Sequence, residues 1–256
     1  MAAERQHGAL ATVFGGSGFV GRHTVRALAR NGWRVRAAVR RPDLAGHLQP
    51  MGVVGQIHPV QANVRYPESV SAALQGSEAV VNLVGILARS RAQTFDAVHV
   101  EGARAIAKAA REAGVRRLVH VSAIGADPAS SSDYGRTKAG GEQAVLDEFP
   151  DAIIIRPSVV FGPEDELFNR FAAMAKISPV LPLIGGGRTR FQPIFVGDLA
   201  AAIRAACEGT GKAGAIYEVG GPETLTFRRI LDLVQQWSGQ KRSYINLPFV
   251  LAKLQA

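Results

Sequence analysis

A tyrosine and a lysine four residues apart carry the clearest catalytic signal in this sequence. Tyr134 and Lys138 lie near the start of a helical stretch, Thr137–Glu148, and residues at i and i+4 share one face of a helix. An ammonium group beside a phenol favours the phenolate, so we expect Lys138 to lower the pKa of Tyr134 from about 10. Such a tyrosine can exchange a proton with a carbonyl or an alcohol. The alternative is an ordinary pair on a helix surface.

Ser122 is a third catalytic candidate, because it directly follows the apolar run Leu118–Val121. A hydroxyl at the end of a buried strand can donate a hydrogen bond to a substrate oxygen. Serine is also a common strand-end cap, and that role stays open. Together the three side chains predict a proton relay that works beside a nicotinamide cofactor.

Three glycines predict where such a cofactor binds. Gly15, Gly18 and Gly21 follow the apolar run Ala9–Phe14 and open a helix that continues to the stop signal Asn31–Gly32. The first glycine permits a tight turn, the second lets backbone N–H groups approach a pyrophosphate, and the third lets the helix pack closely on the strand. The helix N-terminus adds partial positive charge. An ordinary glycine turn is the alternative, but the position between a first strand and a helix favours a dinucleotide.

The end of the second expected strand indicates which nucleotide is preferred. Arg40 and Arg41 follow Arg34–Val39, at the place where a free ribose 2′-hydroxyl favours an acidic residue and a 2′-phosphate favours arginine. We therefore expect NADP(H) to be preferred over NAD(H). A solvated strand end is the alternative.

These residues need a scaffold, and the chain alternates strand and helix patterns through its first two thirds. Such alternation predicts an α/β fold, a Rossmann-type doubly wound parallel sheet with helices on both faces. We expect the dinucleotide-binding core over 1–163, continued by 194–220, and a small C-terminal lobe built from the separated segments 164–193 and 221–256. The expected strands are Ala9–Phe14, Arg34–Val39, Gln56–Val60, Ala79–Val84, Leu118–Val121, Ala152–Ile155 and Ala215–Val219, and the expected helices include Val70–Leu74, Phe95–Ala113, Thr137–Glu148 and Gly197–Cys207.

Composition restricts the partners. The formal net charge of +9 favours anions: a phosphorylated cofactor, an anionic membrane surface or an acidic protein. No nucleic-acid-reading motif accompanies it, so we expect no nucleic-acid partner. The six histidines are scattered, which predicts no metal site. The first strand begins near residue 9, and no apolar stretch reaches membrane-spanning length. These features predict a cytoplasmic protein with at most peripheral contact at the inner face of the membrane.

Motifs along most of the chain resemble the short-chain dehydrogenase/reductase family of the extended or atypical kind. They are GGSGFVG at 15–21, NLVG at 82–85, HVSAIGA at 120–126, YGRTK at 134–138, IRPSVVFGP at 155–163, QPIFVGDLA at 192–200 and YEVGGPETLT at 217–226. Two positions depart from the family pattern. Ser122 and Tyr134 are only 12 residues apart, and His99 stands where many extended members have asparagine.

Several segments are similar to a narrower group, the nucleotide-binding accessory subunits of respiratory complex I and their alphaproteobacterial relatives. The match is carried by ATVFGGSGFVGR, LQPMGVVGQ, VVNLVGIL, SSSDYGRTKAGGE and FPDAIIIRPSVVFGPED. The resemblance implies an NADPH with a structural role. It also implies a set of cofactor residues: Gly15, Gly18, Phe19 and Gly21 at the pyrophosphate, Arg40 with Arg41 beside it at the 2′-phosphate, Asn63 with Val64 near adenine, Leu83, Val84 and Gly85 on the ribose and nicotinamide side, Lys138 on the nicotinamide ribose, and Pro157 near the ring.

Three functions follow. The first is a complex I accessory or assembly protein that holds NADPH structurally. The second is a free oxidoreductase or epimerase/dehydratase that uses Tyr134 and Lys138 on a small carbonyl or sugar-nucleotide substrate. The third is a sensor of NADPH occupancy. Fold alone does not choose among them.

Overall fold

The computed structural model describes residues 8–88 and 93–248. The chain divides into two compact units, Met1–Pro157 with Gly197–Val219, and Ser158–Val196 with Gly220–Ala256. The second unit therefore begins at Ser158, six residues before the boundary expected from the sequence.

The first unit is built on one seven-stranded parallel sheet in the order β11-β6-β5-β4-β1-β2-β3. The predicted fold class is confirmed. Central strands are apolar on both faces, as expected where helices cover both sides of a parallel sheet. The strands are β1 (Leu10–Phe14), β2 (Arg34–Val39), β3 (Ile57–Gln61), β4 (Ala79–Asn82), β5 (Arg117–Val121), β6 (Ile153–Pro157) and β11 (Ile216–Val219).

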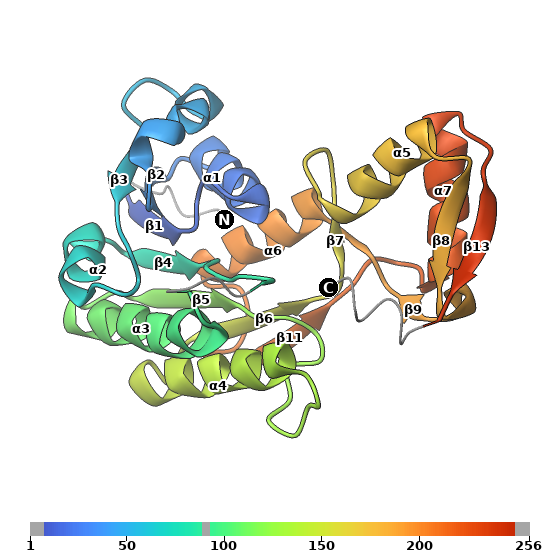
Figure 1. Cartoon of the computed structure of the whole chain (residues 1–256). Helices are drawn as coiled ribbons and strands as arrows, with labels where there is room; N and C mark the ends of the chain where they lie inside the picture. Colours follow the sequence, from blue (N-terminus) through green and yellow to red (C-terminus); the bar gives the residue numbers. More distant parts are fainter. Residues whose placement is uncertain (1–7, 89–92, 249–256) are drawn as a thin grey trace. The chain divides into compact units, whose positions relative to one another are not determined.

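Helices pack on both faces of this sheet. In Figure 1, α1 and α6 lie on one side, and α2, α3 and α4 lie on the other. Phe14, Val80 and Leu118 from the sheet pack with Ile106 of α3 and Val145 of α4 in one buried cluster. The helices are α1 (Phe19–Arg30), α2 (Pro67–Leu74), α3 (Gly102–Glu112), α4 (Asp133–Glu148) and α6 (Val196–Cys207), and short 3₁₀ turns cover Pro42–Leu44 and Gly46–Met51.

One predicted helix is divided. The stretch Phe95–Ala113 contains a π-helical turn, Asp96–Glu101, followed by α3. π-Turns inside helices occur frequently at functional sites, and this one holds His99.

The second unit contains helices and short strands that are not among the elements expected from the sequence, although α7 has the apolar spacing of an amphipathic helix. Leu183, Phe227 and Leu231 form its small core. Its elements are β7 (Val160–Phe161), α5 (Leu167–Ile177), β8 (Val180–Ile184), a 3₁₀ turn (Gly185–Gly187), β9 (Arg190–Phe191), β10 (Ile194–Phe195), β12 (Leu225–Thr226), α7 (Phe227–Ser238) and β13 (Ser243–Leu247). Within residues 8–88 and 93–248, no helix has the length and apolarity that crossing a bilayer requires.

Candidate functional site

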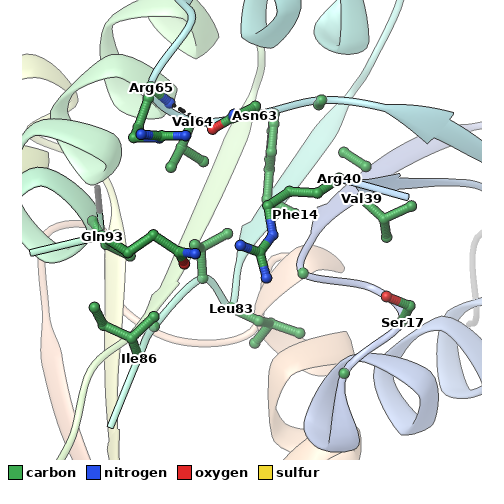
Figure 2. A pocket seen from close by; sticks show the side chains of 17 residues that line it. Phe14, Ser17, Val39, Arg40, Asn63, Val64, Arg65, Leu83, Ile86 and Gln93 are labelled. Carbon is green, nitrogen blue, oxygen red and sulfur yellow. Dashed lines mark hydrogen bonds between the residues drawn. The ribbon is translucent and has the colours of Figure 1, made fainter. Parts of the chain in front are cut away.

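A pocket opens at the carboxyl ends of β1 to β4, where the strand order of the sheet reverses. β1 lies between β2 and β4, and ligands of open parallel sheets bind outside the strand ends at such a switch point. Figure 2 shows the side chains that line the pocket. Eight of the predicted cofactor residues are among them: Gly15, Gly18, Arg40, Asn63, Val64, Leu83, Val84 and Gly85.

The glycine turn forms one wall of the pocket. Gly15 has a φ of +78°, its N–H donates to the Ala38 carbonyl at 3.0 Å, and its own carbonyl accepts from Gly18 N–H at 3.0 Å. A Cβ on Gly21 would lie 2.1 Å from the Gly15 oxygen. The first turn of α1 has no side-chain cap and no acidic residue, so the N-terminus of the helix is suited to an anionic ligand.

The two arginines predicted at the cofactor lie in different surroundings. Arg40 lines the pocket and extends into it in Figure 2. Arg41 instead forms an exposed ion pair with Asp43, with Nη2 and Oδ2 2.9 Å apart, so the structure does not place it at the pocket. Consecutive residues of an extended chain point in opposite directions, and Asp43 provides a local partner for the outer one.

The segment after β4 forms the opposite wall and is held by buried side chains. Asn82 Oδ1 accepts from Val84 N–H at 3.0 Å, and Asn82 Nδ2 lies 3.0 Å from His120 Nδ1. Ile86 N–H donates to His99 Nε2 at 3.1 Å. These contacts fix Leu83–Ile86 before any ligand binds.

Of the predicted catalytic residues, Ser122 directly follows β5, and Tyr134 and Lys138 lie on α4. Ser122 is buried, and its Oγ has no hydrogen-bond partner in the part of the chain that the structure describes. Lys138 is 5% exposed, and its Nζ donates to the Val121 carbonyl, the residue before Ser122, at 3.0 Å. Burial lowers the pKa of Lys138 to about 8, and the charge of Glu142 opposes that shift.

The expected direction of the Tyr134 shift is wrong. Burial raises the pKa of Tyr134, because its surroundings disfavour the charged phenolate. The phenol lies edge-on to the rings of Phe95 and His99. The ammonium of Lys138 is bonded to a backbone carbonyl, and no hydrogen bond between Lys138 and the Tyr134 phenol occurs among the described residues.

Beneath Lys138, one turn further along α4, lies a buried ion pair. Glu142 is 4% exposed, and its carboxylate accepts from Arg156 Nε at 2.9 Å and Nη2 at 2.7 Å. Arg156 also reaches Glu218 at 3.3 Å. Two parallel bonds between a guanidinium and a carboxylate fix relative orientation, so α4 is locked to β6 and β11.

Five predicted cofactor residues do not line the pocket: Phe19, Gly21, Arg41, Lys138 and Pro157. Sequence reasoning also missed residues that do line it. Arg65 directly follows Asn63 and Val64 and could have been found from that position, and the Asn63 side chain accepts its N–H at 3.2 Å. Gln93 carries no sequence signal. No cluster of His, Cys, Asp and Glu suited to a metal ion was found among the described residues.

With this geometry in place, comparison with known proteins identifies the family. Residues 11–220 match the NAD dependent epimerase/dehydratase family. The chain belongs to this family. A solved structure of the same fold is the dTDP-glucose 4,6-dehydratase DesIV of Streptomyces venezuelae with NAD and TYD bound, with a TM-score of 0.78, 24% identity, and coverage of 93% of this chain and 84% of that one.

Two curated relatives differ in what their names state. The mitochondrial NADH dehydrogenase (ubiquinone) 1 alpha subcomplex subunit 9 of Arabidopsis thaliana is 38% identical over 97% of this chain and 63% of its own length. The ceramide reductase of Caulobacter vibrioides is 35% identical over 76% of this chain and 60% of its own length. The chain thus matches less than two thirds of either relative.

Proposed function

We propose that the chain holds NADP(H) in the pocket of the first unit, in preference to NAD(H). Arg40 supplies a positive charge at the end of β2, and no acidic side chain lines the pocket within the described residues. A ribose 2′-hydroxyl favours an acidic partner at this position, whereas a 2′-phosphate is matched by a guanidinium.

The residues present fit such a cofactor. The uncapped N-terminus of α1 and the turn of Gly15, Gly18, Phe19 and Gly21 would receive the pyrophosphate. Arg40 would bind the 2′-phosphate, with Asn63 and Val64 near adenine. The wall Leu83–Gly85 would face the nicotinamide side, with Lys138 and Pro157 toward the nicotinamide ribose and ring.

The role that we propose for this bound cofactor is structural, in an accessory or assembly protein of respiratory complex I. The observation that carries it is the 38% identity to the Arabidopsis thaliana subunit over 97% of this chain. The mitochondrial NADH-ubiquinone oxidoreductase 40 kDa subunit of Neurospora crassa is 33% identical over 96% of this chain and 64% of its own length. The location that follows is peripheral, at the cytoplasmic face of the membrane.

A free oxidoreductase is the second candidate, and the Ser122 hydroxyl, which has no hydrogen-bond partner among residues 8–88 and 93–248, favours it. When bound, NADPH would supply a hydride to a carbonyl carbon. Ser122 Oγ would donate a hydrogen bond to the carbonyl oxygen, and Tyr134 would deliver the proton that completes the alcohol. The resemblance to the ceramide reductase fits this chemistry.

Affinity purification from native membranes separates the two roles. Co-purification of complex I subunits with the wild type and with Tyr134→Phe alike supports the accessory role. Absence of complex I subunits, together with NADPH-dependent reduction of a carbonyl substrate that Tyr134→Phe abolishes, supports the enzyme. For the cofactor, a thermal-shift titration should give a larger rise in Tm with NADPH than with NADH, and equal rises would contradict the proposed preference.

A further inference from the structure

A buried histidine connects the pocket to the helix that carries Tyr134. His99 lies within the π-helical turn Asp96–Glu101 and is 2% exposed. His99 is not among the residues that line the pocket. It nevertheless contacts Ile86 of the pocket wall and Thr137 of α4.

Two hydrogen bonds fix the ring and its tautomer. Ile86 N–H can only donate, so His99 Nε2 is the acceptor of that 3.1 Å bond. The proton therefore resides on Nδ1, which lies 3.0 Å from Thr137 Oγ1. The Thr137 hydroxyl in turn donates to the Asp133 carbonyl at 2.8 Å, so each group in the chain has a consistent role. Burial, with the charge of Lys138, lowers the pKa of His99 to about 4, which keeps the ring neutral near pH 7.

The ring is also clamped between aromatic side chains. It stacks on Phe95 with centroids 5.3 Å apart and an interplanar angle of 23°, and it meets Tyr134 edge-on at 5.5 Å and 89°. Such geometries are the favoured arrangements of π systems. The same imidazole thus touches the Tyr134 ring and holds the pocket segment that ends at Ile86.

The backbone at this point is equally constrained. A Cβ on Gly141 of α4 would lie 2.1 Å from the His99 carbonyl oxygen, and a Cβ on Gly140 would lie 3.2 Å from Val100 Cγ2. Helix α4 therefore packs directly on the π-turn. A shift of His99 must move the pocket wall, Tyr134 or both.

We propose that His99 is a positioning residue that couples the Leu83–Ile86 wall of the pocket to Tyr134, so that the nicotinamide half of the cofactor and the phenol are held in one fixed relation. This inference rests on the proposed binding of NADP(H). It assigns His99 no contact with the cofactor. It predicts that loss of His99 weakens binding of the nicotinamide half and leaves the adenosine half intact.

Two ligands test the proposal, NADPH and adenosine 2′,5′-bisphosphate, which keeps the phosphorylated adenosine and lacks nicotinamide. In titrations of nucleotide-free protein, His99→Ala should raise the Kd of NADPH tenfold or more and leave that of the bisphosphate within about twofold. Retained bisphosphate binding also establishes that the variant is folded. Val145→Ala, a buried change on α4 in the core cluster, is the matched control and should not discriminate between the ligands.

Two conservative variants distinguish the hydrogen bond of His99 to Ile86 from its hydrogen bond to Thr137. Glutamine places an amide oxygen where Nε2 lies, so His99→Gln should keep the Ile86 bond and an NADPH affinity within about threefold of the wild type. The shorter asparagine can serve Thr137 but not Ile86, so His99→Asn should behave as His99→Ala does. It also replaces the alanine variant if that one fails to fold.

The outcomes distinguish this inference from the cofactor proposal. Equal weakening of both ligands by His99→Ala, unchanged NADPH binding, or failure of His99→Gln to restore affinity overturns the coupling role. A wild-type protein that binds neither ligand overturns the proposed NADP(H) binding and this inference with it.

Discussion

The region around Gly15 and Arg40 and the region around Ser122 and Lys138 belong to one unit but differ in how they treat charge. The first is made of backbone N–H groups at the uncapped end of α1 and an exposed guanidinium that follows β2. The second is made of buried side chains, where burial lowers the pKa of Lys138 and raises that of Tyr134. The first region is suited to bind phosphates. In the second region, burial disfavours the charged forms of the Lys138 and Tyr134 side chains unless a ligand compensates the charge.

This difference indicates why holding a nucleotide and reacting with it are separable in this chain. The proposed phosphate binding would depend on backbone geometry and one arginine, which a structural protein needs as much as an enzyme does. In the second candidate function, proton transfer would depend on Tyr134, whose pKa shift is opposite to the one that a phenolate needs. Substitutions in the two regions should therefore affect different measurements.

The largest effect is expected from Gly21→Ala in the glycine turn. The added methyl group would meet the Gly15 oxygen at 2.1 Å, and both partners are backbone-fixed. We expect a loss of more than ~3 kcal/mol in the free energy of unfolding, the upper end of overpacking costs, and no measurable NADPH binding. Urea unfolding and NADPH titration measure the two effects.

Gly46→Ala is the matched control for that change. Gly46 has open space around a Cβ and no positive φ, so the substitution should leave stability and binding close to wild type. A Gly21→Ala protein with wild-type affinity would show that the turn does not hold the pyrophosphate.

Arg40→Ala should have the next largest effect, and a selective one. Hydrogen bonds to charged groups contribute ~1.5–3 kcal/mol, so affinity for NADPH should fall ~10- to 150-fold while affinity for NADH changes little. Arg41→Ala removes a neighbouring arginine that is paired with Asp43 and should leave both affinities unchanged. Equal losses for the two nucleotides in Arg40→Ala would contradict recognition of the 2′-phosphate.

Arg40 and Arg41 also illustrate which features could be predicted from the sequence and which could not. Apolar runs predicted the sheet because a buried parallel strand needs little beyond its own composition, and the bounds of Arg34–Val39 agree with β2 to the residue. The glycine spacing placed the turn beside β1 for the same local reason. Which of two adjacent arginines faces the pocket depends on strand direction and on Asp43.

Long-range contacts explain what was missed. Nothing in the spacing of Tyr134 and Lys138 reveals that Val121, 17 residues away, supplies a carbonyl to the ammonium. The π-turn at His99 likewise depends on the close approach of Gly141, 42 residues further along the chain. Such contacts exist only once the strands are ordered, so a sequence pattern cannot contain them.

Lowering the pH should decrease the free energy of unfolding, because His99, which packs on Tyr134, is neutral in the folded protein. Its folded pKa of about 4 lies below the value of about 6.5 expected in the unfolded chain. The unfolded state therefore takes up the proton first, and the free energy of unfolding falls as pH drops from 6.5 toward 4. Burial is the main cause of the lowered His99 pKa; Lys138 adds to it, and the Ile86 hydrogen bond and Asp96 oppose it. Burial also lowers the pKa of His120, which acts in the same direction.

The measurement is urea unfolding at pH 7 and pH 5. The stability that the wild type loses should exceed the loss in His99→Gln, by up to ~1.4 kcal/mol for each pH unit between the two pKa values. His47→Gln, which replaces an exposed histidine outside this region, should retain the wild-type difference. Identical pH dependence in all three proteins would contradict a neutral buried His99.

The smallest effect is expected from Ser122→Ala, and it has the opposite sign. Ser122 Oγ is buried without a partner among the described residues, and an unsatisfied buried polar group costs ~1–3 kcal/mol. Removing the hydroxyl should raise the free energy of unfolding of the nucleotide-free protein by up to ~1 kcal/mol. Thr137→Val is the control, because it removes a hydroxyl bonded to both His99 and Asp133 and should destabilise. A Ser122→Ala protein less stable than the wild type would mean that the hydroxyl already contributes to folding. A stabilised variant would instead mark Ser122 as a group retained at a cost in stability, as expected of a residue whose partner is a ligand.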